Sequence, residues 1–384
     1  MESYIECKKK LYDVILEFLE ESEEKSQQFE KLCTNLRNCR VEEDREEMTQ
    51  FLLTIKSISD HHHRNAHFIQ KLRQILQHYK EQIKQTLSND KIFHIFESNK
   101  LILHFLLTND IICISENIYN YMVNETEPNG NCYCHFFYPE LERFKGEEKM
   151  KEVKKDLLSL SPTIFENFEE KRQEGENDSY ICSLIRNDSV EDFITYIIKK
   201  SISPSSQIPS SIFETNSFLN NNKSTSLIEY SAFFGSIQIF RFLLMNQVEL
   251  KPSLWLYSIH SKNADLIHLI ESNRIALPES KYGIYSTCLI ESIKCHHNDF
   301  SVYIQDSLMS QQETESKQTK ELLLMKSLKY HNYFYFQTDQ IKEQGLLSLC
   351  FYNYYKIVDF LMKEKEKEIE KRIILKIIVF CIIF

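Results

Sequence analysis

Charged residues in the N-terminal part of the chain are interrupted by apolar side chains that recur every three or four positions. Leu11, Ile15 and Phe18 form one such set, and Phe51 and Ile55 belong to another. Residues three and four apart lie on the same face of a helix, so this spacing predicts amphipathic helices with one buried face.

The polarity changes several times farther along the chain. Apolar residues become denser from Ile92 to Val123, which predicts buried helices, whereas charged residues dominate from Glu140 to Glu176, which predicts an exposed helix and a linker. The stretch from Ser201 to Ser226 is rich in serine, asparagine and proline, so it cannot form one regular helix. It is either an ordered connector or a flexible loop, and its apolar Ile212 and Phe213 favour a connector packed against the next segment.

One pattern of apolar and small residues occurs three times between Ser226 and Ile304. The first copy reads S-L-I-E-Y-S-A-F-F-G-S-I-Q-I-F-R-F-L-L, later copies begin at Ser253 and Thr287, and an echo begins near Gln344. Residues at matching offsets are predicted to be equivalent and buried: Ala232, Ile259 and Ile293 in the first helix of each copy, and Ile239, Leu266 and Phe300 in the second. A repeat that cannot bury its own apolar face must stack on a neighbour, so the pattern predicts a solenoid of antiparallel helix pairs.

The turn between the two helices of the first copy is predicted at Gly235. Glycine enters the left-handed conformation without steric cost, which suits the residue that follows a helix. The later copies carry Lys262, His296 and Asn353 at this position, and of these only asparagine suits a left-handed backbone. We therefore expect a lower local stability than in an array of regular repeats.

Three further sequence segments, together with the first copy, support a comparison with a known protein family. E-D-F-I-T-Y-I-I begins at Glu191, P-S-S-I-F-E-T-N-S-F-L at Pro209, and P-S-L-W-L-Y-S-I-H at Pro252. The chain from about Leu101 onward resembles a large protist (trichomonad-type) family of ankyrin-repeat proteins, in which a domain of unknown function adjoins degenerate repeats. The resemblance implies an intracellular protein that binds other proteins, and it carries over no catalytic residues.

The expected fold is all-α, with an N-terminal helical domain followed by a degenerate ankyrin-type helical solenoid. The expected parts are an N-terminal helical domain at 1–150, a charged helix and connector at 151–225, degenerate ankyrin-like repeats at 226–309, and an atypical repeat with an apolar tail at 321–384. The six glycines and seven prolines in 384 residues leave little material for the tight turns of a sheet, which supports this prediction.

Composition narrows the classes of function. The formal net charge of -10 argues against binding to nucleic acid, because that binding depends on neutralising phosphates with lysine and arginine. The glycines lie too far apart for phosphate loops, dinucleotide turns or nucleophile elbows, so we expect no enzymatic activity. The N-terminal residues lack the apolar core of a signal peptide, which favours the cytosol or nucleus. We expect the eleven cysteines to be reduced and to form no disulfides.

Two clusters of histidine and cysteine raise the question of a metal site. His63 and His67 are spaced to share one helix face, but Arg64 stands where a zinc protease has its glutamate, and no third ligand is evident. A C-x-C-H string begins at Cys132, but its spacing is not the usual C-x-x-C and no second half follows. We therefore expect no metal and no cofactor.

The second copy holds the residues that we expect to meet a partner protein. Trp255 occupies the position of a consensus core leucine, so a buried role is expected for it. Tyr257 lies two residues farther along and should project to another face. This makes Tyr257 or His260 the expected contact with an unidentified protein partner.

An alternative function rests on the C-terminal tail. The segment from Ile373 to Phe384 is apolar and follows a charged run, but it is shorter than the roughly 20 residues that span a bilayer. The tail is either part of an altered repeat or a means of attachment for a peripheral membrane or structural adaptor.

Overall fold

The described part of the chain is built from helices. The computed structural model describes residues 1–21, 26–125, 132–221, 224–279, 283, 285–309, 316–336 and 345–365. These residues form no β-strand, and an isolated bridge joins Gln207 to Ser226, which confirms the all-α prediction. None of the helices described is both long and apolar enough to cross a membrane. The apolar tail from Ile373 lies outside the described residues.

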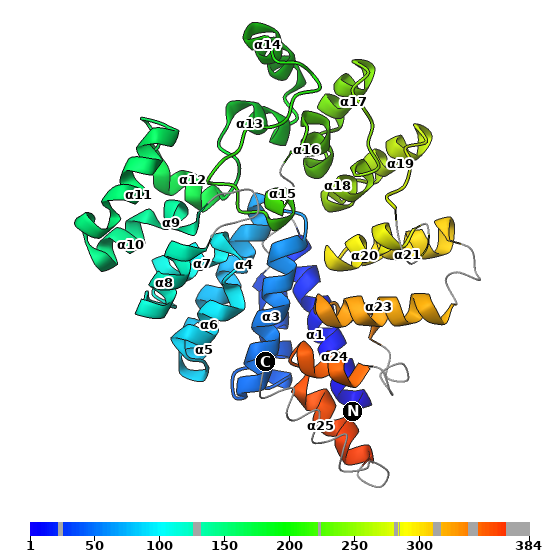
Figure 1. Ribbon diagram of the computed structural model, residues 1–384. Helices are drawn as coiled ribbons and strands as arrows, with labels where there is room; N and C mark the ends of the chain where they lie inside the picture. Colours follow the sequence, from blue (N-terminus) through cyan, green and yellow to red (C-terminus); the bar gives the residue numbers. More distant parts are fainter. Residues whose placement is uncertain are drawn as a thin grey trace. The chain divides into compact units, whose positions relative to one another are not determined.

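The helices separate into two compact units (Figure 1). Unit 1 comprises Met1–Ile58, Arg64–Ile75 and Glu279–Phe384, and unit 2 comprises Ser59–His63 and Leu76–Pro278. Unit 1 thus combines both ends of the sequence. The sequence predicted four consecutive parts, and unit 1 contains segments from the first, third and fourth of them.

Unit 1 contains four N-terminal helices and the helices that follow residue 279. Their bounds are α1 (Glu2–Glu20), α2 (Ser26–Asn38), α3 (Arg45–His61), α4 (Ala66–His78), α20 (Ser286–Lys294), α21 (Asn298–Tyr303), the π-helix η1 (Ile304–Leu308), α23 (Lys317–Lys329), the 3-10 helix η2 (Tyr333–Tyr335), α24 (Gly345–Phe351) and α25 (Tyr355–Lys365). The last residues of α3 and α4 are assigned to unit 2. Within unit 1, α1 packs on α2 and η2, and α20 packs on α21 and α23.

The apolar faces of the N-terminal helices are buried as the spacing predicts. Leu11, Ile15 and Phe18 of α1 are almost inaccessible, as are Phe51 and Ile55 of α3. One detail of the sequence interpretation is wrong, because α3 ends at His61 and α4 begins at Ala66. His63 and His67 therefore do not share the face of one helix.

Ion pairs in unit 1 join positions that are remote in sequence. Lys8 pairs with Glu47, and both side chains are buried. The Nζ atom of Lys356 lies 2.9 Å from Oε1 of Glu47 and 2.7 Å from Oδ2 of Asp44. These contacts tie α25 to α3 and to the residue that precedes it.

Unit 2 contains the remaining helices. Their bounds are α5 (Lys80–Thr86), α6 (Asn89–Phe96), α7 (Lys100–Thr108), α8 (Glu116–Asn124), α9 (Tyr133–Phe136), α10 (Tyr138–Lys145), α11 (Glu147–Leu160), α12 (Phe168–Glu174), α13 (Tyr180–Arg186), α14 (Val190–Lys200), α15 (Ser217–Asn221), α16 (Leu227–Phe234), α17 (Ile237–Met245), α18 (Leu254–Ser261) and α19 (Ala264–Ser272). The pairs α13–α14, α16–α17 and α18–α19 follow one another, with α16 packed on both α13 and α18 (Figure 1).

The segment between α14 and α16 is an ordered connector in its described residues. Ile212, Phe213 and Phe218 are buried, and backbone hydrogen bonds join it to the start of α16. One of these runs from the amide of Ile208 to the carbonyl of Thr225, with a length of 2.9 Å. The preference for a packed connector is therefore confirmed.

Candidate functional site

The second helices of the three pairs in unit 2 share one register of buried positions. A residue with a left-handed backbone follows each of the helices α14, α17 and α19. Phe193, Ile239 and Leu266 lie the same number of positions before that residue in their respective helices, and all three are fully buried. The next shared buried position is occupied by these residues: Ile197, Leu243 and Ile270. The register extends the predicted equivalence of Ile239 and Leu266 to a pair that begins before residue 226.

The turns inside these pairs also share one geometry. A left-handed residue follows the first helix in each pair: Asp188 with a φ of 48°, Gly235 with 70° and Lys262 with 53°. In the first two pairs the amide of the next residue donates to a carbonyl of the helix, as in the 2.9 Å bond from Ser236 to Ser231. In the third pair the amide of Asn263 donates to Oγ of Ser261 over 3.2 Å. This is the helix ending that glycine adopts at least cost.

Side chains of the turns connect each pair to the next. The carboxylate of Asp188 accepts hydrogen bonds of 3.0 Å from the amides of Gln238 and Ile239, at the start of α17. The side-chain amide of Asn263 donates to the carbonyl of Gly235 over 3.3 Å. These contacts supply polar links in addition to the apolar contacts between the helices.

The residues proposed as repeat positions lie in helices or at their ends. In unit 2, Ala232 and Ile259 are buried in the first helices, and Gly235 ends α16. In unit 1, Ile293 is buried in α20, whereas Phe300 of α21 is only partly buried. Helix α21 is short and passes directly into η1, and Ser301, next to Phe300, takes the fully buried place.

The structure corrects the expected partner contacts in the second copy. Tyr257 is 3% exposed and His260 is 1% exposed, so neither can meet a partner without rearrangement. The hydroxyl of Tyr257 lies 3.0 Å from Oγ1 of Thr225, and the ring of His260 lies 4.1 Å from that of Phe218. The connector covers this face of α18, which a helical wheel of α18 alone could not reveal. Trp255 is buried, as expected.

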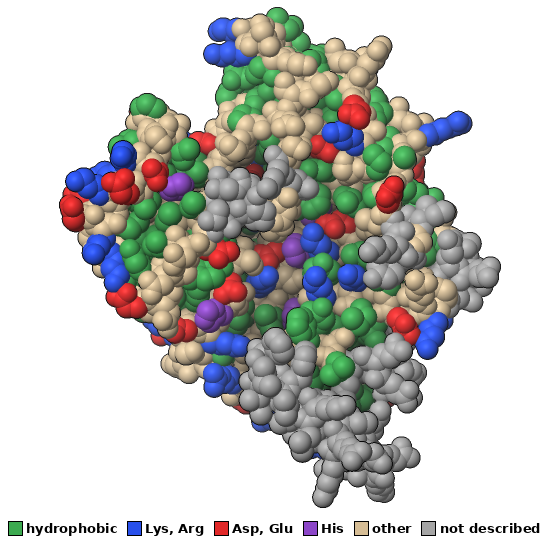
Figure 2. Space-filling view, viewed as in Figure 1, with side chains coloured by type: hydrophobic (Ala, Val, Ile, Leu, Met, Phe, Trp, Pro, Cys, Tyr) green, Lys and Arg blue, Asp and Glu red, His purple; other side chains and the backbone are tan. Residues whose placement is uncertain are grey.

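The large accessible side chains of the pairs lie on the second helices α14 and α17, apart from Tyr180 of the first helix α13, which is 56% exposed. Ile198 near the end of α14 is 72% exposed, and Met245 at the end of α17 is 75% exposed. The shared exposed position one turn earlier is occupied by Thr195, Arg241 and His268. Figure 2 shows hydrophobic side chains at the surface among polar and charged ones. The sequence interpretation missed this face because it placed the contact on the first helix.

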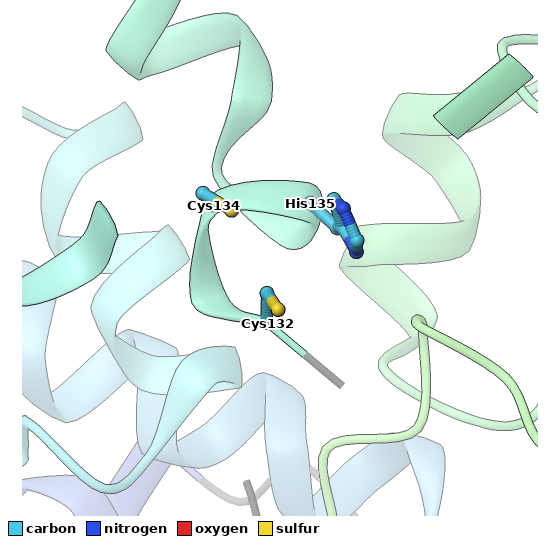
Figure 3. Close-up of side chains that lie close together, drawn as sticks. All are labelled: Cys132, Cys134 and His135. Carbon is cyan, nitrogen blue, oxygen red and sulfur yellow. The ribbon is translucent and has the colours of Figure 1, made fainter. Parts of the chain in front are cut away.

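The C-x-C-H string forms a tight cluster in unit 2 (Figure 3). The Sγ atoms of Cys132 and Cys134 and a ring nitrogen of His135 all lie within 4.8 Å of one another. Burial and, to a smaller extent, the neighbouring Cys132 together raise the pKa of Cys134 to about 12. Burial also lowers the pKa of His135, although the carboxylate of Asp156 opposes this shift. At neutral pH the cluster holds a protonated thiol at Cys134 and a neutral imidazole at His135.

The expectation that the chain forms no disulfide is wrong. In unit 1 the structure pairs Cys7 of α1 with Cys39, whose Cα atoms are 6.6 Å apart. The packing of α1 against α2 brings the two residues together, although 32 positions separate them in sequence. Spacing along the chain gave no indication of this contact.

No family model matches this chain, and no match was found among curated proteins or among solved structures. The resemblance to ankyrin-repeat proteins therefore stays a prediction.

Proposed function

We propose that this chain is a noncatalytic, intracellular helical-repeat protein of the ankyrin type that binds another protein through the second helices of its stacked pairs. The observation that carries the proposal is the shared register of α14, α17 and α19, in which the same positions are buried in each helix. Helix pairs in such an array depend on their neighbours for burial and present a continuous row of accessible side chains. Rows of this kind serve as binding surfaces in repeat proteins.

The accessible row offers apolar anchors for a partner. Ile198 and Met245 are large side chains left mostly in water, and burying each of them would contribute about 1.5–3 kcal/mol to association. Arg241 of α17 and His268 of α19 are also exposed and can form hydrogen bonds at the edge of an interface. An apolar centre with polar neighbours is the usual composition of a protein-binding surface.

Affinity capture with three forms of the full chain tests the proposal. The forms are the unchanged chain, the double variant Ile198→Asp/Met245→Asp, and the control Leu160→Asp. Leu160 of α11 is 58% exposed and lies in the same unit but outside the stacked pairs, so it controls for the loss of an exposed apolar side chain. We expect the unchanged chain and the control to retain the same protein and the double variant to lose it.

The capture experiment is informative only if the double variant is folded like the parent. Because both substituted positions are exposed, the double variant should keep the helical circular dichroism and melting transition of the parent. If a folded double variant captures the same protein in the same amount, the proposed surface is wrong.

A further inference from the structure

The cluster at Cys132, Cys134 and His135 lies outside the stacked pairs and has no part in the proposed function. Its three side chains come from one stretch of chain at the start of α9 (Figure 3). Thiolate and neutral imidazole are the groups that bind zinc in proteins. A tetrahedral Zn²⁺ with Zn–S bonds of about 2.3 Å spaces its ligand atoms roughly 3.8 Å apart, so the observed limit of 4.8 Å needs only a small closure.

The backbone that carries the cluster is held in place on both sides. The amide of Tyr133 donates to the carbonyl of Glu125 over 3.2 Å, and the amide of His135 donates to the carbonyl of Cys132 over 3.2 Å. The aromatic side chains between and after the ligands are buried: Tyr133, Phe136 and Phe137. Packing of α9 against α8, α10 and α11 therefore fixes the ligands before any ion is bound.

We propose that Cys132, Cys134 and His135 bind one Zn²⁺ ion. The three protein ligands leave a fourth position for water. Binding converts the two thiols to thiolates and releases their protons to solvent. The ion stabilises this part of unit 2, because it binds the folded chain in preference to the unfolded one.

Titration of the full chain with Co²⁺, in a reductant that does not bind metals, tests the site. Tetrahedral Co²⁺ bound to thiolates absorbs visible light, and Zn²⁺ should displace it and abolish the colour. We expect one equivalent of Co²⁺ to bind to the unchanged chain. The variants Cys132→Ser and His135→Gln should lose the thiolate-type spectrum or its one-to-one stoichiometry. The matched control is Cys113→Ser, which removes an exposed free cysteine of the same unit and should leave the titration unchanged.

Comparison of folded proteins keeps the test independent of misfolding. Cys132 and His135 are only partly buried, so Cys132→Ser and His135→Gln should keep the helical circular dichroism of the parent. Three results would overturn the zinc site: no Co²⁺ binding by the unchanged chain, the same spectrum in folded Cys132→Ser, or binding of Cu⁺ without Zn²⁺.

Discussion

Trp255 illustrates at the level of one residue how the second repeat copy is held together. The side chain is buried, and its Nε1–H donates to the carbonyl of Ile275 over 3.0 Å. This bond holds the residues that follow α19 against α18. The sequence predicted the buried role from the leucine-like position but could not indicate the acceptor.

Trp255→Ala should lower the free energy of unfolding by about 3–5 kcal/mol, because it removes a large buried ring and a hydrogen bond. Trp255→Phe keeps most of the apolar contact and loses the donor, so we expect a smaller loss of about 1–3 kcal/mol. Thermal and denaturant unfolding monitored by circular dichroism measure both. An alanine variant that melts like the parent but loses its partner would make Trp255 a contact residue instead of a core residue.

His331 in unit 1 gives a second prediction at this scale, on the dependence of stability on pH. The ring is buried, and its Nδ1 lies 3.0 Å from the hydroxyl of Tyr354. Burial and, to a smaller extent, the nearby positive charge of Lys56 together lower the pKa of His331 to about 3. Histidine in the unfolded chain titrates near 6.5. The unfolded chain therefore gains a proton that the folded chain does not, and stability falls as pH drops from about 6.5 toward 3.

His331→Asn should reduce this loss of stability. Asparagine tolerates the left-handed backbone at this position, where φ is 49°, and it does not titrate. Denaturant unfolding at about pH 7.5 and about pH 5 measures the loss for each form. The control His67→Asn changes an exposed histidine of the same unit and should leave the loss unchanged. Equal losses in the parent and His331→Asn would show that another group causes the acid sensitivity.

The ends of the helices are the elements that the sequence predicted best. Gly235 has a φ of 70°, and Lys262 takes the equivalent left-handed conformation without being glycine. A Cβ atom added to Gly235 would lie 3.3 Å from Cβ of Ser261 and 3.4 Å from Cβ of Asn263. Both the backbone conformation and the neighbouring turn therefore favour glycine here.

Gly235→Val should destabilise the chain by about 1–3 kcal/mol, because a β-branched residue has both an unfavourable backbone conformation and a crowded side chain at this position. Gly235→Asn is the matched control, since asparagine adds a similar Cβ but tolerates the left-handed backbone. We expect asparagine to cost clearly less than valine in a comparison of melting temperatures. If valine costs no more than asparagine, the backbone conformation does not determine the preference for glycine.

The surface of these elements was harder to predict than their buried positions. Periodicity identified Ile239 and Leu266 as buried, because apolar spacing depends on local geometry alone. It failed for Tyr257 and His260, because the connector around Phe218 packs on that side of α18. Packing by a segment that lies more than 30 residues earlier in the chain leaves no periodic trace in the helix itself.

At the scale of the whole molecule, unit 1 joins the two ends of the sequence through contacts that no local pattern predicts. Lys8 and Glu47 come from the N-terminal helices, and Lys356 comes from α25. Burial lowers the pKa of Lys8, and the carboxylate of Glu47 opposes this shift. The cost of burying these charges is offset only while the partners are in place. The spacing of charged residues along the chain does not predict ion pairs between residues so far apart in sequence. The prediction from the sequence therefore divided the chain into consecutive parts.

Lys8→Met should destabilise the chain by roughly 1–3 kcal/mol, because the buried Glu47 loses one of its two cationic partners and keeps only Lys356, 2.9 Å from its Oε1. The double variant Lys8→Met/Glu47→Leu should recover much of that loss, since it replaces both charges with apolar groups. Lys356 keeps its 2.7 Å contact with Asp44 in the double variant. Denaturant unfolding of the three proteins tests this prediction, and a double variant less stable than Lys8→Met would contradict it.

The most direct test of the central claim is hydrogen exchange of the full chain with and without the captured partner protein. If the second helices of the stacked pairs form the binding surface, the partner should slow exchange in peptides from α14 and α17, which carry Ile198 and Met245. Peptides from α11, which carries Leu160, should exchange at the same rate in both samples. Protection confined to α11 or to unit 1, with α14 and α17 unchanged, would contradict the proposal.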